Sequence, residues 1–314
     1  MCIRDRDLPP KPEKSPRKDH WKSPDGKWRV FTRGYNVWIR ATEGNEEIQL
    51  SHDGKEQDRY EGYLRWSPDS RYIGIVRRQQ VDERRVQYVE SSPSKQLQPK
   101  SFTRVYAKPG DKIPTYTVHV FEAVKDGKHF TVDPALVKDP FETRELKWRP
   151  DSSGLLFEHI ERGFGAHRVI EIPVAAGKAR TLIDETAETF VFVFGNSFRR
   201  DVNDLKEIIW RSERDGWNHL YLYDGVTGKV KNQITKGQWV VREVVEVDED
   251  KRQIIFRAAG REPGQDPYYL HTYRVNFDGT GLLRLTEGDG THSTQVSPDK
   301  TVFIDTWSLS LIHI

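Results

Sequence analysis

One turn motif recurs along the chain at intervals that any fold must explain. A proline after the first residue fixes φ, and an aspartate followed by glycine or serine closes the turn through its own side chain. Intact or degenerate copies are Ser23-Pro24-Asp25-Gly26, Ser67-Pro68-Asp69-Ser70, Arg149-Pro150-Asp151-Ser152, Asp201-Val202-Asn203-Asp204, Asp248-Glu249-Asp250-Lys251 and Ser297-Pro298-Asp299-Lys300. Their starts are 44, 82, 52, 47 and 49 residues apart. All but one of these intervals lie close to the ~40–50 residues of a propeller blade.

Strand signals follow each turn. A short aliphatic or aromatic run comes first, as in Tyr72–Val76, and most units continue with a run that alternates apolar and polar residues, as in Leu220–Tyr223. Alternation with period two indicates a half-buried strand. The sequence therefore predicts an all-β fold, a β-propeller of four-stranded blades with about six blades in an incomplete ring. A β-sandwich, or two small β domains, is the alternative.

Composition excludes several classes of protein. Charged residues make up 31% of the 314-residue chain, and no apolar run approaches the ~18 residues of a membrane-spanning helix. Fifty basic and 48 acidic residues leave a net charge of +2, which is too balanced for a nucleic-acid-binding surface. The single cysteine, Cys2, excludes an internal disulfide framework and a cysteine-rich zinc site.

The two ends of the chain differ from the rest. Residues 1–6 and 309–314 resemble translated sequencing adapters, and residues 7–20, rich in Pro, Lys and Asp, indicate a loop or linker. We expect one propeller domain over residues 21–308 and a reading frame truncated at both ends. The alternative is that both ends are native.

Three segments resemble one family of enzymes. These are Trp66-Ser67-Pro68-Asp69, then Leu97–Lys100 with Tyr106–Asp111, and then Ser212-Glu213-Arg214-Asp215-Gly216-Trp217-Asn218-His219-Leu220-Tyr221. In this order they resemble the N-terminal propeller of dipeptidyl peptidase IV-like serine peptidases, within the prolyl oligopeptidase group. The resemblance covers nearly all of residues 20–308.

The resemblance implies a two-domain exopeptidase. Its propeller would screen peptides and hold their free N-terminus, and a C-terminal α/β-hydrolase domain would cleave after a penultimate proline or alanine with a Ser, Asp, His triad. The nucleophile pattern G-x-S-x-G is absent here, because Gly195-Asn196-Ser197 is followed by Phe198 and Arg199. We therefore expect no catalytic residue, cofactor or metal in this chain, and a missing hydrolase domain as its partner.

The family grips the substrate ammonium with a pair of glutamates. In some relatives this pair lies just before a stretch like Asp58-Arg59-Tyr60-Glu61-Gly62-Tyr63, and the two positions ahead of Gln57 are here Lys55 and Glu56. One carboxylate is kept, whereas Lys55 would repel an ammonium. Glu56 is the candidate anchor, and Asp58 or Glu61 could substitute for the missing carboxylate. The alternative for Glu56 is a solvated loop carboxylate.

The long interval after Ser67 contains the other candidate site. It is either one blade with an insertion, over Arg77–Pro114, or two blades with one eroded turn. Long insertions in compact repeats are often functional. Its arginines could hold a substrate carbonyl or carboxylate: Arg84, Arg85 and Arg104. Equally, the insertion could be an arm that packs on the hydrolase or on a second subunit of a homodimer.

Three functions remain open. The first is the substrate-gating propeller of a dipeptidyl-peptidase-like enzyme acting on peptides. The second is a stand-alone propeller that binds a protein or a carbohydrate, and the third is the propeller of an acylaminoacyl or tripeptidyl peptidase, which Lys55 keeps open. Trp217, Asn218 and His219 are expected to be structural, and the histidines show no metal-binding spacing. Because bacterial members are often exported, we expect a periplasmic or extracellular location.

Truncation at both ends predicts poor behaviour of the isolated chain. Propellers protect strand edges by arranging blades in a ring, and missing blades leave edges unpaired. We expect the purified chain to aggregate or to unfold at low denaturant concentration. A monomeric elution profile together with a sharp, reversible melt would contradict this expectation.

Overall fold

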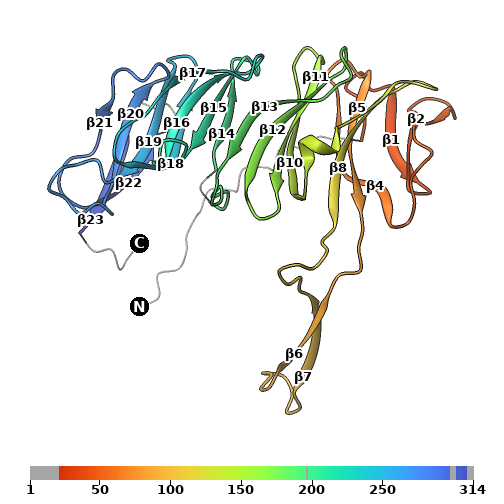
Figure 1. Ribbon diagram of the computed structural model, residues 1–314, viewed down its shortest axis with the longest axis horizontal. Coiled ribbons are helices and arrows are strands. Elements are labelled where there is room, and N and C mark those ends of the chain that lie inside the picture. The colour runs from red at the N-terminus through yellow and green to blue at the C-terminus, as the bar shows by residue number, and fades with distance from the viewer. Residues whose placement is uncertain (1–20, 196, 298–301, 310–314) are drawn as a thin grey trace, which may run out of the picture.

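The computed structural model describes residues 21–195, 197–297 and 302–309, and its regular structure over these residues is almost entirely β (Figure 1). The main strands form six antiparallel sheets, which we name blades A to F. Blade A contains β1 (Trp28–Arg33), β2 (Asn36–Ala41) and β3 (Glu47–Gln49), and blade B contains β4 (Asp58–Trp66), β5 (Tyr72–Gln79), β8 (Thr115–Glu122) and β9 (His129–Thr131). Blade C contains β10 (Pro140–Trp148), β11 (Gly154–Glu161), β12 (Ala166–Pro173) and β13 (Arg180–Thr186), and blade D contains β14 (Arg199–Val202), β15 (Glu207–Ser212), β16 (His219–Asp224) and β17 (Val230–Gln233). Blade E contains β18 (Val240–Asp248), β19 (Gln253–Ala259), β20 (Leu270–Asn276) and β21 (Leu283–Arg284), and blade F contains β22 (Thr291–Val296) and β23 (Phe303–Ser308). Within the described ranges the single helical element is the 3-10 helix η1 (Pro134–Val137).

The propeller prediction is confirmed. Blades B to E each have four strands in the order of the sequence, blade A has three, and the described part of blade F has two. Figure 1 shows the blades side by side in chain order, from β1 at one end of the row to β23 at the other. The described residues form no closed ring.

The 82-residue interval after Ser67 is one blade with an insertion, and not two blades with one eroded turn. The chain leaves blade B after β5 and returns at β8, which pairs directly with β5. Between them lies a separate hairpin, β6 (Arg85–Glu90) and β7 (Lys100–Val105), in which Tyr88 faces Phe102. We call residues 80–114 the arm. It projects away from the row of blades (Figure 1).

The Ser-Pro-Asp turns are built by their own side chains. The Ser67 hydroxyl donates to Asp69 Oδ1 over 2.5 Å and accepts the N–H of Tyr72 over 2.9 Å. The Ser23 hydroxyl likewise donates to Asp25 Oδ1 and accepts the N–H of Trp28. At the last copy, residues 298–300 of the motif lie outside the described residues. Each turn thus begins the next strand at a fixed register.

One degenerate copy is displaced from its predicted place. Asp201 and Val202 belong to β14, and the turn is formed by residues 203–206, where the N–H of Lys206 donates to the carbonyl of Asn203 over 3.0 Å. Asn203, Asp204 and Leu205 all have positive φ. Because this copy has no proline to fix the turn, the register of β14 sets the position of the turn.

Neighbouring blades are joined through these same turns. The N–H of Asp25 donates to Ser70 Oγ of the next blade over 3.0 Å, and the N–H of Asp69 donates to Ser152 Oγ over 3.0 Å. A second bond runs alongside, from Trp148 Nε1 to the carbonyl of Arg65 over 2.9 Å. The turn motif therefore fixes the contact between blades as well as the turn itself.

The hydrophobic core lies between the blades. Four clusters of buried side chains fill the boundaries A/B, B/C, C/D and D/E, and the cluster at C/D is the smallest of them. On β11, Leu155 and Phe157 face blade B while Leu156 faces blade D. Both faces of the strand are covered, so its sequence lacks polar alternation there. Gly74 of β5 allows blades B and C to approach closely, since a Cβ there would lie 2.5 Å from Leu155 Cδ2.

The bond between blades B and C gives a stability prediction. Trp148→Phe removes the indole N–H, leaves the carbonyl of Arg65 without that donor and keeps an aromatic ring against Tyr72. We expect the free energy of unfolding in urea to fall by about 1–2 kcal/mol. Trp217→Phe is the matched control, because Trp217 is 39% exposed, and it should cost less than about 0.5 kcal/mol. Equal losses in the two variants would mean that the bond between blades contributes nothing.

Candidate functional site

The predicted anchor Glu56 lies in a tight turn at the end of blade B. Lys55 and Asp58 exchange two backbone hydrogen bonds of 2.8 and 3.0 Å, which places Glu56 and Gln57 at the exposed tip. The carbonyl of Gln57 accepts the N–H of Gln80, the first residue of the arm, over 2.7 Å. The two regions singled out in the sequence therefore meet: the Glu56 turn is fastened to the base of the arm.

Asp58 is neutralised by an arginine of its own blade. Arg77 donates from Nε to Asp58 Oδ1 over 2.7 Å and from Nη2 to Asp58 Oδ2 over 2.8 Å. The same guanidinium reaches Asp53 Oδ2 over 2.5 Å, and the buried hydroxyl of Tyr60 donates to Asp53 Oδ1. Burial raises the pKa of Asp53, but its bonds to Arg77 outweigh that effect and hold the pKa below its usual range. An ammonium would have to compete with Arg77 for these carboxylates.

Glu61 is also committed to arginines. Its two carboxylate oxygens accept from Arg59 Nε over 2.6 Å and from Arg78 Nη1 over 3.0 Å. Burial raises the pKa of Glu61, and the two arginines more than offset it, so the pKa is lowered. Of the three candidate carboxylates, Glu56 alone has no ion-pair partner among the described residues. Whether any of the three binds substrate stays a prediction.

The arm does not bring its three candidate arginines together. Arg84 lies at the base, where it donates to both oxygens of Asp111 over 2.6 and 2.8 Å and lowers the pKa of that carboxyl. Arg85 and Arg104 are on opposite faces of the hairpin, since Arg85 faces Val105 across the strands and Arg104 faces Val86. The Arg104 guanidinium lies 5.8 Å from the ring centre of Tyr88. The three arginines therefore do not form one binding site.

Sequence reasoning missed two adjoining cavities at the boundary between blades C and D. Their volumes are about 230 and 280 Å³, and His167, Ser197 and Trp210 line both. On the floor of the first, Glu185 accepts from Ser212 Oγ over 2.5 Å and from Arg214 Nη2 over 2.7 Å. Ser212 and Arg214 belong to the segment that carried the family resemblance, and this was the only signal of the site in the sequence.

Phenylalanines surround this boundary. Phe190 and Phe192 line the first cavity and are 55% and 45% exposed. Nearby in sequence, Phe194 packs edge-to-face on Phe164 with ring centres 4.9 Å apart, and Phe164 packs on Phe141 at 5.1 Å. Apolar walls with a few convergent polar groups are typical of ligand pockets. The arrangement can bind an apolar side chain and orient a polar group beside it.

Within the segment Trp217–His219, Asn218 lines the first of these cavities, so the expected structural role is supported for His219 alone. His219 is fully buried, and its ring nitrogens lie 3.0 Å from Thr235 Oγ1 and 2.9 Å from the carbonyl of Gly237. Among the described residues, no group of three His, Cys, Asp or Glu side chains could hold a metal ion. In the same part of the chain, no helix is long and apolar enough to cross a membrane.

The fold and the sequence together define a β-propeller of one particular class. Residues 5–312 match the family described as "Dipeptidyl peptidase IV (DPP IV) N-terminal region". Because the match covers most of the chain, the protein belongs to this family.

Curated relatives carry related names. A probable dipeptidyl-aminopeptidase B from Talaromyces marneffei is 23% identical over 305 residues, which cover 84% of this chain and 33% of the relative. One from Paracoccidioides lutzii is 26% identical over 298 residues, covering 82% and 31%. The chain thus spans about a third of the length of the curated relatives it matches.

Solved structures agree on the fold. Dipeptidyl peptidase 4 from Porphyromonas gingivalis superposes with a TM-score of 0.61 at 20% identity, over 91% of this chain and 41% of that one. A putative dipeptidyl aminopeptidase IV from Bacteroides ovatus gives a TM-score of 0.54 at 16% identity, over 89% and 47%. These likenesses establish the propeller architecture of the chain.

The buried carboxylate Glu158 beside the cavities predicts acid sensitivity. Burial raises its pKa, but His167 at 2.9 Å, Arg199 and Arg144 outweigh this and hold the pKa at about 2. A carboxyl group whose pKa is lower in the folded than in the unfolded state stabilises the fold fully at pH values above its unfolded-state pKa. This stabilisation is lost as the pH falls toward the folded-state pKa. We expect Glu158 to contribute on the order of 2–3 kcal/mol at pH 7, lost between about pH 4.5 and pH 2.

Urea unfolding at several pH values checks this expectation. The variant Glu158→Gln should be less stable at neutral pH and should lose less stability than the unchanged chain between pH 4.5 and pH 2. Glu188→Gln, at an exposed position, is the control and should reproduce the original profile. Identical pH profiles for Glu158→Gln and the unchanged chain would contradict the assignment.

Proposed function

We propose that this chain is the substrate-selecting propeller of a dipeptidyl-peptidase-like serine exopeptidase. It would limit access to an active site on a C-terminal α/β-hydrolase domain and hold the free N-terminus of the peptide. Family membership supports the peptidase class, and the chain spans about a third of its curated relatives, which leaves length for a second domain. The hydrolase chemistry and the release of Xaa-Pro or Xaa-Ala dipeptides are part of this proposal.

The exposed carboxylate of Glu56 is the observation on which the proposal depends. An ammonium group carries three N–H donors and favours a carboxylate that no other cation occupies. Asp58 and Glu61 are engaged by arginines, whereas Glu56 has no cationic partner among the described residues. The turn is also fastened to the base of the arm, so that its position relative to blade B is fixed. Glu56 is therefore the best available acceptor for a peptide N-terminus.

Lys55 favours a second candidate. Its ammonium lies one residue from Glu56 in the same exposed turn, and like charges repel an incoming amine. A peptidase that prefers a blocked N-terminus, such as an acylaminoacyl peptidase, would not suffer from this repulsion. The two candidates share the same propeller and differ in the charge of the peptide end that they accept.

Chromogenic substrates distinguish the candidates in the full-length enzyme. Free Xaa-Pro substrates should be cleaved in preference to their N-acetylated forms, because only the free amine pairs with Glu56. Glu56→Ala should lower kcat/KM for the free substrates by about 10- to 100-fold, as expected for the loss of a charged hydrogen bond. Lys55→Glu should raise it, because it supplies a second carboxylate.

The control is Glu46→Ala, at an exposed position in blade A, which should leave kcat/KM unchanged. Equal turnover of free and acetylated substrates would exclude ammonium anchoring and favour the second candidate. The gene beyond codon 308 gives an independent check: an open frame with a G-x-S-x-G motif is expected. A stop codon directly after this segment would argue for a stand-alone binding propeller.

A further inference from the structure

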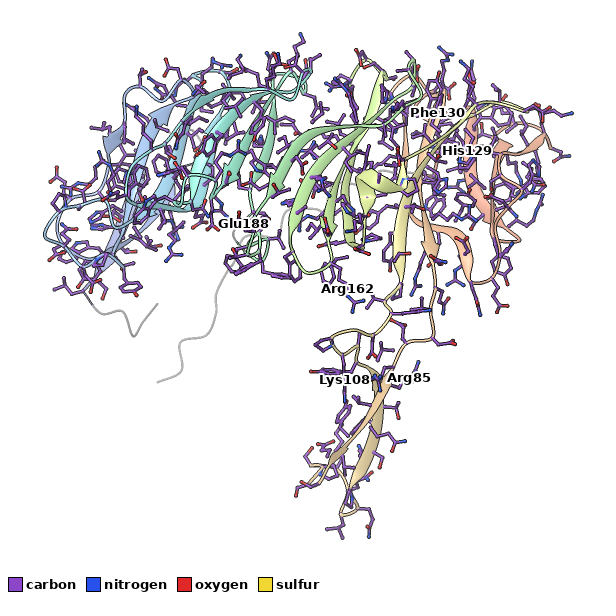
Figure 2. All side chains as sticks on the ribbon, in the orientation of Figure 1. Arg85, Lys108, His129, Phe130, Arg162 and Glu188 are labelled. Carbon is purple, nitrogen blue, oxygen red and sulfur yellow. The ribbon has the colours of Figure 1, made fainter. Side chains whose placement is uncertain are left out.

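A third cavity at the boundary between blades C and D lies at the end of the blades away from the arm. In blades B to E the strands run antiparallel in chain order, so the turns after the first and third strands share one end. The connections after the second and fourth strands, which include the arm, share the other end. Figure 2 shows two of these connections on the side of the arm, at Arg162 after β11 and Glu188 after β13. The third cavity, of about 660 Å³, is formed by turns of the opposite end.

Buried charged side chains form the base of this cavity. Glu171 is 2% exposed, and its two carboxylate oxygens accept from Arg149 Nε and from Arg180 Nε, the latter over 2.8 Å. Arg149 also donates to the carbonyl of Gly225 in blade D over 2.7 Å. Arg180 donates to the carbonyl of Val226, in the same turn, over 2.6 Å. The two arginines therefore hold the turns of both blades in place around the cavity.

Two cations beside this base have no partner. Lys178 and Lys206 line the cavity, are exposed and form no ion pair with any described residue. Of the exposed carboxylates in the lining, Asp151 accepts the N–H and the hydroxyl of Ser153 over 3.0 and 2.6 Å, whereas Asp204 forms no ion pair within the described ranges. Four basic and three acidic side chains line the cavity, so its net charge is +1.

The walls of the cavity are apolar. They are formed by two prolines, two alanines and a half-exposed valine: Pro150, Pro173, Ala175, Ala176 and Val226. Ligand pockets typically have volumes of ~300–1,000 Å³ and combine apolar walls with a few polar groups that orient the ligand. The cavity has both properties, and its unpaired lysines supply the polar groups.

The next boundary shows that unpaired lysines are not required by the architecture. The corresponding turns of blades D and E enclose a cavity of about 440 Å³, lined by Lys231, Arg252 and Lys251. Lys231 and Arg252 pair with the buried Glu207 over 2.5 and 2.7 Å, and Lys251 pairs with Asp248 over 3.6 Å. All three cations of that cavity have a carboxylate partner, whereas Lys178 and Lys206 have none.

We propose that the cavity between blades C and D binds a monocarboxylate with an apolar body. The carboxylate pairs with Lys178 and Lys206, and the apolar body lies against the proline, alanine and valine walls. Asp204 repels a second negative charge, which disfavours phosphate and other dianions. A peptide with an apolar C-terminal residue and a small apolar organic acid share this chemistry. The proposal is independent of the peptidase proposal, because it involves no residue of the Glu56 turn.

Ligand-observed NMR titration of the chain tests the proposal with two carboxylates, N-acetyl-Val-Pro and hydrocinnamate, each compared with its amide. At least one of the two acids should bind with a Kd of about 0.1–1 mM. Its amide and inorganic phosphate should bind at least about tenfold more weakly. Binding of the peptide alone would identify a peptide C-terminus as the ligand, and binding of hydrocinnamate alone a small organic acid. Binding of neither acid, or equal binding of an acid and its amide, would overturn the proposal.

Variants of the lining locate the binding. Lys178→Ala with Lys206→Ala should raise the Kd by about tenfold or more, because the carboxylate loses both cations. Ala176→Asp should raise it by a similar factor, because it places a negative charge on the apolar wall. Both variants should keep the urea unfolding midpoint of the unchanged chain, since all three side chains are exposed.

The matched control makes the same change in charge outside the cavity. Lys27→Ala with Lys125→Ala replaces two exposed lysines in the turns before β1 and β9, and neither lysine lines the cavity. This variant should bind the acid with an unchanged Kd. Equal weakening in the two double variants would overturn the proposal, since net charge alone would then explain the binding.

Discussion

The hydrogen bond from one blade's turn to the next blade is the constraint on which this architecture depends. The N–H of Asp25 reaches Ser70, the N–H of Asp69 reaches Ser152, and the N–H of Asn203 reaches Glu249 Oε2 over 3.1 Å. The three pairs are 45, 83 and 46 residues apart, and the middle one includes the arm. Because each bond joins the turns of consecutive blades, it helps to fix how one sheet packs on the next.

The boundary between blades C and D departs from this pattern. Arg149 replaces the serine that starts the turn, and its guanidinium donates to Glu171, to the carbonyl of Leu205 over 3.2 Å and to that of Gly225 over 2.7 Å. Buried charge thus replaces a hydroxyl contact where the apolar cluster is smallest. Buried ion pairs cost desolvation and stabilise less than apolar packing. The same boundary contains the two cavities lined by His167, Ser197 and Trp210, so the candidate pocket lies where the apolar core is smallest.

The sequence predicted the repeat well and the site only partly. The proline-containing turns within the described residues were placed correctly, because their bonds involve residues at most five apart, as between Ser67 and Tyr72. One of the two turns without proline, at Asp201, was placed two residues early, since strand register, a tertiary effect, positions it. Asp58 and Glu61 appeared available as acceptors because their partners Arg77 and Arg78 lie on the adjacent strand, in a register that was not predictable from spacing alone. The cavity residues come from several strands of two blades and share no local pattern.

The way in which the arm joins blade B has a consequence for how such proteins change. The chain departs after Gln79 and returns at Thr115, and these two residues face each other as the last pair between β5 and β8. To the blade, the whole arm is therefore equivalent to an enlarged hairpin loop. The length and surface chemistry of the arm can therefore change without disturbing the packing of the blade B core. Evolution, or a protein engineer, can exchange the arm while the blades remain intact.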